Sequence, residues 1–150
     1  MTTTDPLSLT VDKFVFTVPT DRAYSPDHCW VLREGGAVKV GLTDFRQQTI
    51  GDVACVECKP AGTKLAVGDD LASVETIKAS IAVPAPVSGI VVAVNESLTQ
   101  QPELLNEACY GQGWLTLLSP IEAGDFDQLL GPPAYLALVR KEAEVAEAGW

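Results

Sequence analysis

Between residues 53 and 94 the chain consists almost entirely of short runs of β-branched and small residues, separated by Gly and Pro. Runs of this kind predict short strands, and their close spacing predicts a compact β-sandwich or barrel. Gly68 and Gly89 mark two turns, and Lys78 lies ten residues after the first and eleven before the second. We therefore expect Lys78 at the tip of a hairpin, where one enzyme can modify its side chain and the modified arm can reach into another protein.

The flanking segments predict further strands together with short helices, chiefly C-terminal. Thr43 is expected to cap a short helix that ends at Gly51. The other expected elements are strands at 13–18, 30–33, 37–40 and 113–118, a helical turn at 102–106, and helices at 125–130 and 133–148. The expected fold is mainly β with a few helices.

Length and charge exclude several classes of protein. A chain of 150 residues, 47% of them hydrophobic, predicts one domain with one substantial core. We find no apolar run of the length of a membrane span and no signal-peptide pattern at the N-terminus, which predicts a cytoplasmic protein. The net charge is −10 and basic residues do not cluster, which argues against nucleic-acid binding. An acidic surface of this kind can dock into the basic cleft of a partner protein, or it can serve solubility alone, and the sequence favours neither.

The four cysteines predict thiols rather than disulfides in this compartment. Cys55 and Cys58 form a CxxC pattern within an expected strand, where residues three apart point to opposite faces. The chain has one histidine and no second CxxC, so a zinc site is not expected. A thiol oxidoreductase would need a well-placed pair, so we expect these two cysteines to serve strand packing.

An exposed lysine on a turn is usually just solvated, and the surrounding pattern is what makes Lys78 a candidate site. The pieces that carry this pattern are Tyr24 to Val31, Val40 to Phe45, Lys64 to Asp69, Leu71 to Ala79, Ala85 to Gly89, Val94 to Leu98, Pro102 to Asn106 and Tyr110 to Leu115. Together they resemble the lipoyl domains, and specifically the H protein of the glycine cleavage system, from about residue 24 to about residue 143. Biotinyl domains share that fold, but they typically flank the lysine with methionines, and here the neighbours are Ile77 and Ala79.

The resemblance implies a barrel-sandwich hybrid fold with lipoate bound covalently to Lys78. It implies a non-catalytic carrier that works with a lipoate–protein ligase, glycine cleavage enzymes and dihydrolipoamide dehydrogenase. Glu75, Ile77 and Ala79 complete the expected attachment site, and the intact hairpin argues against an unmodified binding module. We expect residues 1–20 to be an N-terminal extension and residues 21–150 to form the H-protein-like domain with its C-terminal helices.

The chain departs from its family around the arm. The family usually has His-Glu-Trp where this chain has His28-Cys29-Trp30, and it tends to have an acidic residue where this chain has Ala82. A cationic amine without a carboxylate partner is costly to shelter. These losses predict a sulfur-bound cargo, as in the H-like lipoate-binding proteins of sulfur oxidation, with a heterodisulfide-reductase-like complex as partner. The glycine cleavage H protein, carrying an aminomethyl group, is the alternative.

Two residues next to this position are candidates for contact with the lipoyl arm. Cys29 is expected either to exchange with the arm's dithiol or to fill a pocket as a small residue. His28 is expected either to donate a hydrogen bond to the arm or to satisfy a local carbonyl. Cys109 carries no special prediction, and Trp30 and Trp114 are expected to be core aromatics.

Overall fold

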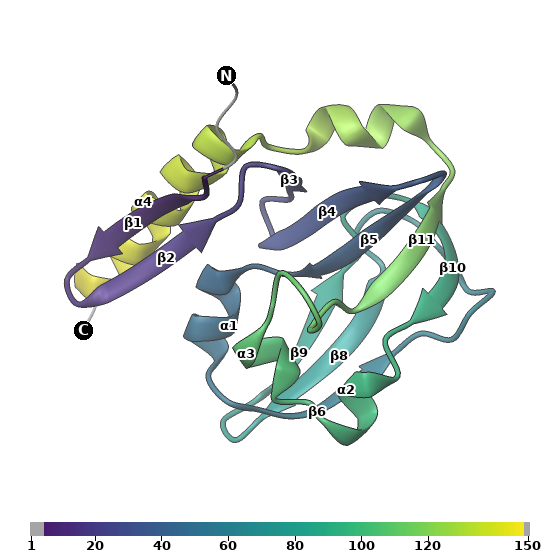
Figure 1. Ribbon diagram of the computed structural model, residues 1–150, viewed down its shortest axis with the longest axis horizontal. Coiled ribbons are helices and arrows are strands. Elements are labelled where there is room, and N and C mark those ends of the chain that lie inside the picture. Colours follow the sequence, from purple (N-terminus) through teal and green to yellow (C-terminus); the bar gives the residue numbers. More distant parts are fainter. Residues whose placement is uncertain (1–4, 149–150) are drawn as a thin grey trace.

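The protein is described by a computed structural model over residues 5–148, and two antiparallel sheets form its body (Figure 1). The larger sheet has six strands in the order β3-β4-β5-β11-β10-β7 and the smaller has three in the order β6-β8-β9. The strands are β3 (Ala23–Tyr24), β4 (Cys29–Glu34), β5 (Ala37–Leu42), β6 (Val53–Cys58), β7 (Lys64–Leu65), β8 (Asp70–Thr76), β9 (Ser80–Pro84), β10 (Gly89–Val94) and β11 (Thr116–Pro120). This confirms the predicted mainly-β, barrel-sandwich type of fold.

The main core lies between these two sheets. Val38 and Val40 of β5 and Leu118 of β11 belong to the same buried cluster as Leu71 and Val74 of β8. Each of these side chains is at most 1% exposed. Burial of a side chain of this size contributes about 1.5–3 kcal/mol, so the facing sheets hold each other in place.

The helices lie at the rim of the sandwich. Helix α1 (Asp44–Ile50) begins as predicted, with the Thr43 side chain accepting from the Arg46 backbone N–H at 3.3 Å. It ends at Gly51, whose φ of 81° suits a glycine. Two four-residue helices, α2 (Ser97–Gln100) and α3 (Leu104–Glu107), precede β11. The predicted helices at 125–130 and 133–148 are a 3₁₀ helix η1 (Ala123–Gln128) and α4 (Pro132–Ala148).

An N-terminal hairpin forms a separate two-stranded sheet outside the sandwich. It consists of β1 (Leu7–Val11) and β2 (Phe14–Val18), of which the sequence analysis predicted only the second. The hairpin lies against α4, as Figure 1 shows at the left of the view. Leu9 and Phe16 share a second buried cluster with Tyr135 and Val139 of α4. The N-terminal segment is therefore packed onto the C-terminal helix.

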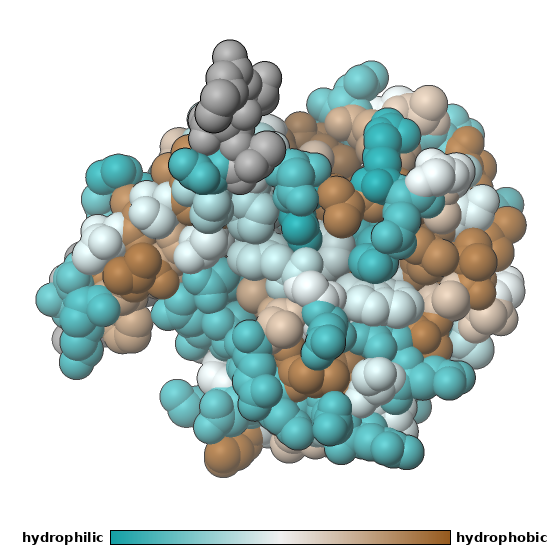
Figure 2. Space-filling model, viewed as in Figure 1, coloured by the Kyte–Doolittle hydropathy of each residue, from teal (hydrophilic) through white to brown (hydrophobic). Residues whose placement is uncertain are grey.

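The surface mixes hydrophilic side chains with smaller apolar patches, as the face shown in Figure 2 illustrates. Among residues 5–148, no helix combines the length and the apolar composition needed to cross a membrane.

Candidate functional site

Lys78 lies in the turn that joins β8 to β9, at the tip of the predicted hairpin. The turn is closed by a bond from the Thr76 backbone N–H to the Ala79 carbonyl at 2.8 Å. The Thr76 hydroxyl oxygen also accepts from the backbone N–H groups of Lys78 (3.2 Å) and Ala79 (3.1 Å). One threonine side chain thus fixes the backbone on which Lys78 stands.

The tip of this hairpin is open to solvent. Ile77, Lys78 and Ala79 are all exposed, and the Ile77 side chain retains 85% of its accessible surface. Within the part of the chain that the structure describes, no hydrogen bond or ion pair occupies the Lys78 ammonium. An enzyme can therefore reach Nζ without moving the body of the protein.

Glu75 lies on the outer face of the smaller sheet, three residues before the lysine. It pairs with Cys55 of β6 on one side and with Ser80 of β9 on the other, and all three are exposed. Cys58 is half-buried, and its Sγ lies 3.6 Å from the Leu115 carbonyl oxygen. The two cysteines of the CxxC pattern differ in exposure as expected from their spacing, and all four cysteines are free thiols.

Cys29 is fully buried at the start of β4. Its backbone N–H bonds to the Ser25 hydroxyl at 3.1 Å, and its Sγ lies 3.7 Å from the Pro84 carbonyl oxygen at the end of β9. Burial raises the pKa of the Cys29 thiol to about 12, so the thiol is neutral near pH 7. A buried neutral thiol is a poor nucleophile, so this environment favours pocket filling over exchange with the arm, and both roles stay predictions.

The His28 ring contacts side chains of the C-terminal helix α4. Its ring is buried, with Nδ1 2.8 Å from the Tyr135 hydroxyl and Nε2 3.0 Å from a Glu142 carboxylate oxygen. Both ring nitrogens therefore have side-chain partners on α4 rather than a local backbone carbonyl, and a hydrogen bond from His28 to the arm stays a prediction. The separations of 107 and 114 residues explain why the sequence did not reveal these partners.

Phe45 of α1 packs beside this histidine. Its ring centroid lies 4.9 Å from that of His28 and 5.1 Å from that of Phe16 in the N-terminal hairpin. Trp30 is fully buried, as expected of a core aromatic, and its Nε1–H donates to the carbonyl of Cys109 at 2.8 Å. Trp114 is only half-buried, with the Lys39 ammonium 5.2 Å from the centre of its ring.

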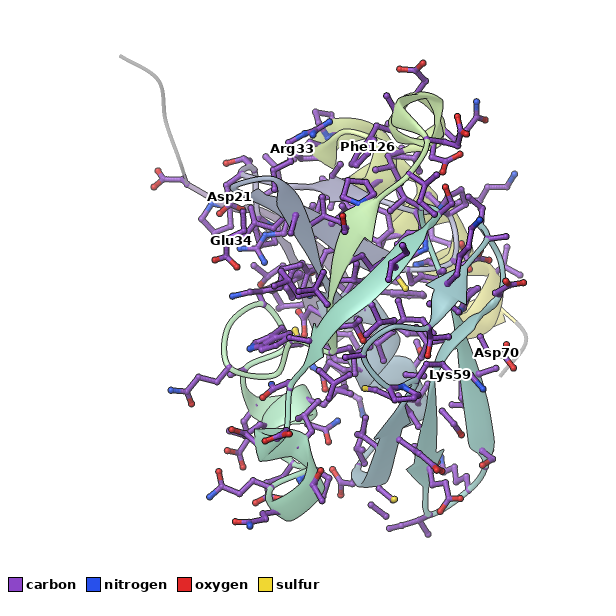
Figure 3. The ribbon with its side chains drawn as sticks, turned by 90° about the vertical axis from the view of Figure 1, so that its right-hand side faces the viewer. Asp21, Arg33, Glu34, Lys59, Asp70 and Phe126 are labelled. Carbon is purple, nitrogen blue, oxygen red and sulfur yellow. The ribbon has the colours of Figure 1, made fainter. Side chains whose placement is uncertain are left out.

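A surface hollow of about 350 Å³ lies beside the outer end of β4. Arg33 and Phe126 line it, and Figure 3 shows them next to each other, with the guanidinium carbon 4.2 Å from the ring centre. Arg22 also lines the hollow, but it already donates to Asp21 and to the Tyr110 carbonyl. No residue of the β8–β9 hairpin lines this hollow.

Comparison with known proteins gives one consistent match. The family model described as "Glycine cleavage H-protein" matches residues 22–142. A glycine cleavage system H protein of Thermus thermophilus is 41% identical over 126 residues, covering 84% of this chain and 98% of the relative. A probable glycine cleavage system H protein of Haloarcula marismortui is 46% identical over 120 residues, covering 80% and 94%.

A solved structure agrees with these matches. The crystal structure of a glycine cleavage system H protein from Mycobacterium marinum superposes with a TM-score of 0.73 at 31% identity, covering 80% of this chain and 97% of that one. These relatives bear the name of the glycine cleavage system, so they favour our alternative prediction over sulfur oxidation. They lend no support to a heterodisulfide-reductase-like partner.

Proposed function

The chain belongs to the glycine cleavage H-protein family, and we propose that it holds lipoate on Lys78 and shuttles an aminomethyl group between the enzymes of a glycine cleavage system. Members of this family are non-catalytic carriers with lipoate attached covalently to a lysine. The observation that carries the assignment to Lys78 is its position at the exposed tip of the β8–β9 hairpin. The partners proposed are a lipoate–protein ligase, the glycine cleavage enzymes and dihydrolipoamide dehydrogenase.

The residues around Lys78 fit a covalently attached acyl group. Attachment requires an accessible Nζ, and the neighbouring Ala79 presents only a methyl group to the arm. Thr76 fixes the turn through its hydroxyl, so a ligase meets one backbone conformation rather than an ensemble. Glu75 and Ile77 are exposed on either side of Thr76, where we propose that the ligase contacts and recognises them.

The chain's own contribution is to hold the arm clear of its body and to present it. Lipoate held on Lys78 would supply a disulfide, which can accept both the aminomethyl group and the electron pair left when glycine loses carbon dioxide. The smaller sheet holds the base of the hairpin, because β8 pairs with both β6 and β9. The long flexible arm then supplies the reach, while the chemistry belongs to the partner enzymes.

An amine-bearing arm needs a counter-charge where it rests on the protein, and Cys29 does not supply one because its thiol is buried and neutral. We propose that Asp27 does. Asp27 is exposed in the tight turn two residues before Cys29. The turn is fixed by a bond from the His28 backbone N–H to the Ser25 carbonyl at 3.0 Å. A carboxylate there can pair with an ammonium at the end of the arm.

A sulfur-carrying arm is the second candidate function, and one specific observation favours it. Both positions where the family tends to have a carboxylate are uncharged here, with Cys29 buried and Ala82 exposed on β9. A sulfur-bound cargo would not require either carboxylate. The relatives favour an aminomethyl cargo over a sulfur cargo. Because the two candidates differ in the cargo on the arm, loading experiments can distinguish them.

The experiment begins with lipoylation of the purified chain by a lipoate–protein ligase, followed by intact mass and peptide mapping, with Lys78→Arg as the matched control. The holo-protein is then offered glycine with glycine decarboxylase and, separately, a persulfide donor after reduction. We expect one lipoyl group on Lys78, none in the control, and aminomethylation. The Asp27→Asn variant should release the aminomethyl group faster, whereas Asp127→Asn, which changes an exposed aspartate of η1, should not.

Each result decides between the candidates. Absence of an adduct at Lys78 would overturn the carrier proposal itself. Sulfur loading without aminomethylation would overturn the glycine cleavage assignment in favour of the second candidate. An unchanged release rate in Asp27→Asn would remove only the counter-charge assigned to that residue.

A further inference from the structure

Strand β1 of the N-terminal hairpin has an outer edge whose backbone groups are directed away from its partner. On β2, the backbone of Thr17 bonds outward to Asp44 and Tyr110, and the Val15 carbonyl accepts from Gln48. These outward residues face Ser8 and Thr10 across the hairpin. In an antiparallel pair, residues opposite an outward-bonding residue also direct their N–H and C=O groups outward. The backbone groups of Ser8 and Thr10 therefore form the free edge of β1.

α4 packs on one face of β1, but the strand itself lacks the charges, proline and bulges that usually protect an exposed edge. Its sequence is Leu-Ser-Leu-Thr-Val, with no charge and no proline, and its pairing with β2 shows no bulge. No hydrogen bond from the backbone of Ser8 or Thr10 to another described residue is present. Exposed edges of this kind are templates for pairing with another strand. The hairpin also lies outside the span 22–142 that matches the family, so the edge is an addition to the family's common part.

We propose that β1 pairs with β1 of a second copy of this chain, joining the two hairpins into one four-stranded antiparallel sheet. The two-fold axis passes beside Leu9, so that Ser8 of each copy faces Thr10 of the other. This register uses every outward N–H and C=O of those two residues, which gives four hydrogen bonds. A shift of two residues in one direction would place Thr10 opposite Pro6, which has no N–H to donate.

The side chains of β1 suit the same register. On the face toward α4, Leu9 is 4% exposed, whereas its neighbours Leu7 and Val11 remain half-buried. Pairing about Leu9 places Leu7 of one copy opposite Val11 of the other, so the remaining apolar surface of both is covered. The register also brings Asp5 at one end of the strand opposite Lys13 at the other, which sets opposite charges across the interface.

An interface made by one short strand is small. Interfaces below about 1,200 Å² belong to the weak, transient class. The dimer should therefore form only at protein concentrations in the upper part of the micromolar range, and it should dissociate on dilution. Such an equilibrium leaves both lipoyl hairpins accessible, because β8 and β9 belong to a different sheet. The proposal does not depend on the cargo of the arm.

The test is sedimentation velocity of the full chain over about a hundredfold range of concentration. The wild type should shift from 15.9 kDa toward twice that mass. Thr10→Pro removes an outward N–H that β2 does not use, and should remain monomeric. Thr10→Lys should also remain monomeric, because the two lysines would repel each other across the interface. This second variant keeps the test valid if the proline variant misfolds. Val15→Lys is the matched control: it places the same charge on the exposed face of β2, opposite Thr10 but away from the edge, and should dimerise normally.

Amide hydrogen exchange supplies a second readout at residue level. The N–H groups of Ser8 and Thr10 should exchange rapidly in dilute samples and become protected at high concentration, while those of Leu7 and Leu9 change little. A wild type that stays monomeric at every concentration would overturn the proposal. So would dimers of Thr10→Pro and Thr10→Lys as stable as those of the wild type.

Discussion

His28 and Glu142 are in contact although 114 residues separate them, with Nε2 of the ring 3.0 Å from a carboxylate oxygen. The other ring nitrogen lies 2.8 Å from the Tyr135 hydroxyl, which in turn lies 2.6 Å from Oγ1 of Thr43. Thr43 caps α1. A continuous chain of polar contacts therefore joins the C-terminal helix to the start of β4 and to the first helix of the sandwich.

Removal of the His28 ring should destabilise the protein, because it leaves the buried Tyr135 hydroxyl with one partner fewer and opens a cavity. We expect His28→Ala to lower the free energy of unfolding by about 1–3 kcal/mol in urea titrations. Glu144→Gln removes a charge from an exposed position of the same helix and should change it by less than about 0.5 kcal/mol. Equal stability of the two variants would show that the contact contributes nothing to the fold.

The N-terminal hairpin should be part of the cooperative unit rather than an appendage. Phe16 is 5% exposed and packs against Phe45, so Phe16→Ala should cost about 3–5 kcal/mol of unfolding free energy. Val15→Ala alters the neighbouring residue, which is 53% exposed, and should cost far less. Hydrogen exchange of the α4 amides should accelerate in Phe16→Ala only. Unchanged α4 protection would mean that the hairpin does not hold that helix.

Much of the fold followed from the sequence because local signals agreed with the tertiary structure. Thr43 and Gly51 bracket α1 as capping chemistry requires. Strand β1 was missed because its turn to β2, at Asp12 and Lys13, contains no glycine, although Asp12 adopts a φ of 56°. An aspartate can take that conformation at modest cost, so the usual glycine signal for a hairpin was absent.

In the candidate site, too, local features were predicted from the sequence and long-range contacts were not. The position of Lys78 followed from turn spacing and from the family pattern, both of which are local. The surroundings of His28 and Cys29 did not, because they depend on contacts with α4 and with the end of β9. His28 also has a φ of 70°, a left-handed conformation that sequence periodicity does not reveal. Long-range packing determines the surroundings of these two residues.

The Thr76 hydroxyl should control the conformation on which Lys78 is presented. Thr76→Val keeps the shape of the side chain but cannot accept from the N–H groups of Lys78 and Ala79. Because the turn is exposed, the cost in global stability should stay below about 1.5 kcal/mol. The two amides should exchange faster with solvent, and lipoylation should slow severalfold. Ser73→Ala, on the same strand and also exposed, is the control and should lipoylate at the wild-type rate. A wild-type rate in Thr76→Val would show that the ligase does not depend on a fixed turn.

The four thiols should react with a maleimide in the order of their burial. Cys55 is exposed on the outer face of β6 and should be labelled first, with Cys58 slower because it is half-buried and burial raises its pKa. Cys29 and Cys109 should react only after denaturation. Peptide mapping of briefly labelled protein checks the order, and Cys55→Ser should abolish the fast phase. Early labelling of Cys29 would show that its thiol is accessible, and would support its predicted exchange with the dithiol of the arm.

Stability should fall at alkaline pH, because the buried thiols keep their protons in the folded protein longer than in the unfolded chain. Burial raises the pKa of both Cys29 and Cys109 to about 12, whereas an unfolded cysteine ionises near about 8.5. Above that value the unfolded state binds fewer protons, so the free energy of unfolding should decrease as pH rises, by up to about 1.4 kcal/mol per pH unit for each thiol. The stabilisation is fully present below about pH 8.5 and is lost on the way to the folded pKa near about 12. Urea titrations between about pH 8 and about pH 10.5 should therefore give a shallower slope for Cys29→Ala than for the wild type, whatever its stability at neutral pH. Parallel slopes would show that the Cys29 thiol ionises equally readily in both states, in conflict with its complete burial.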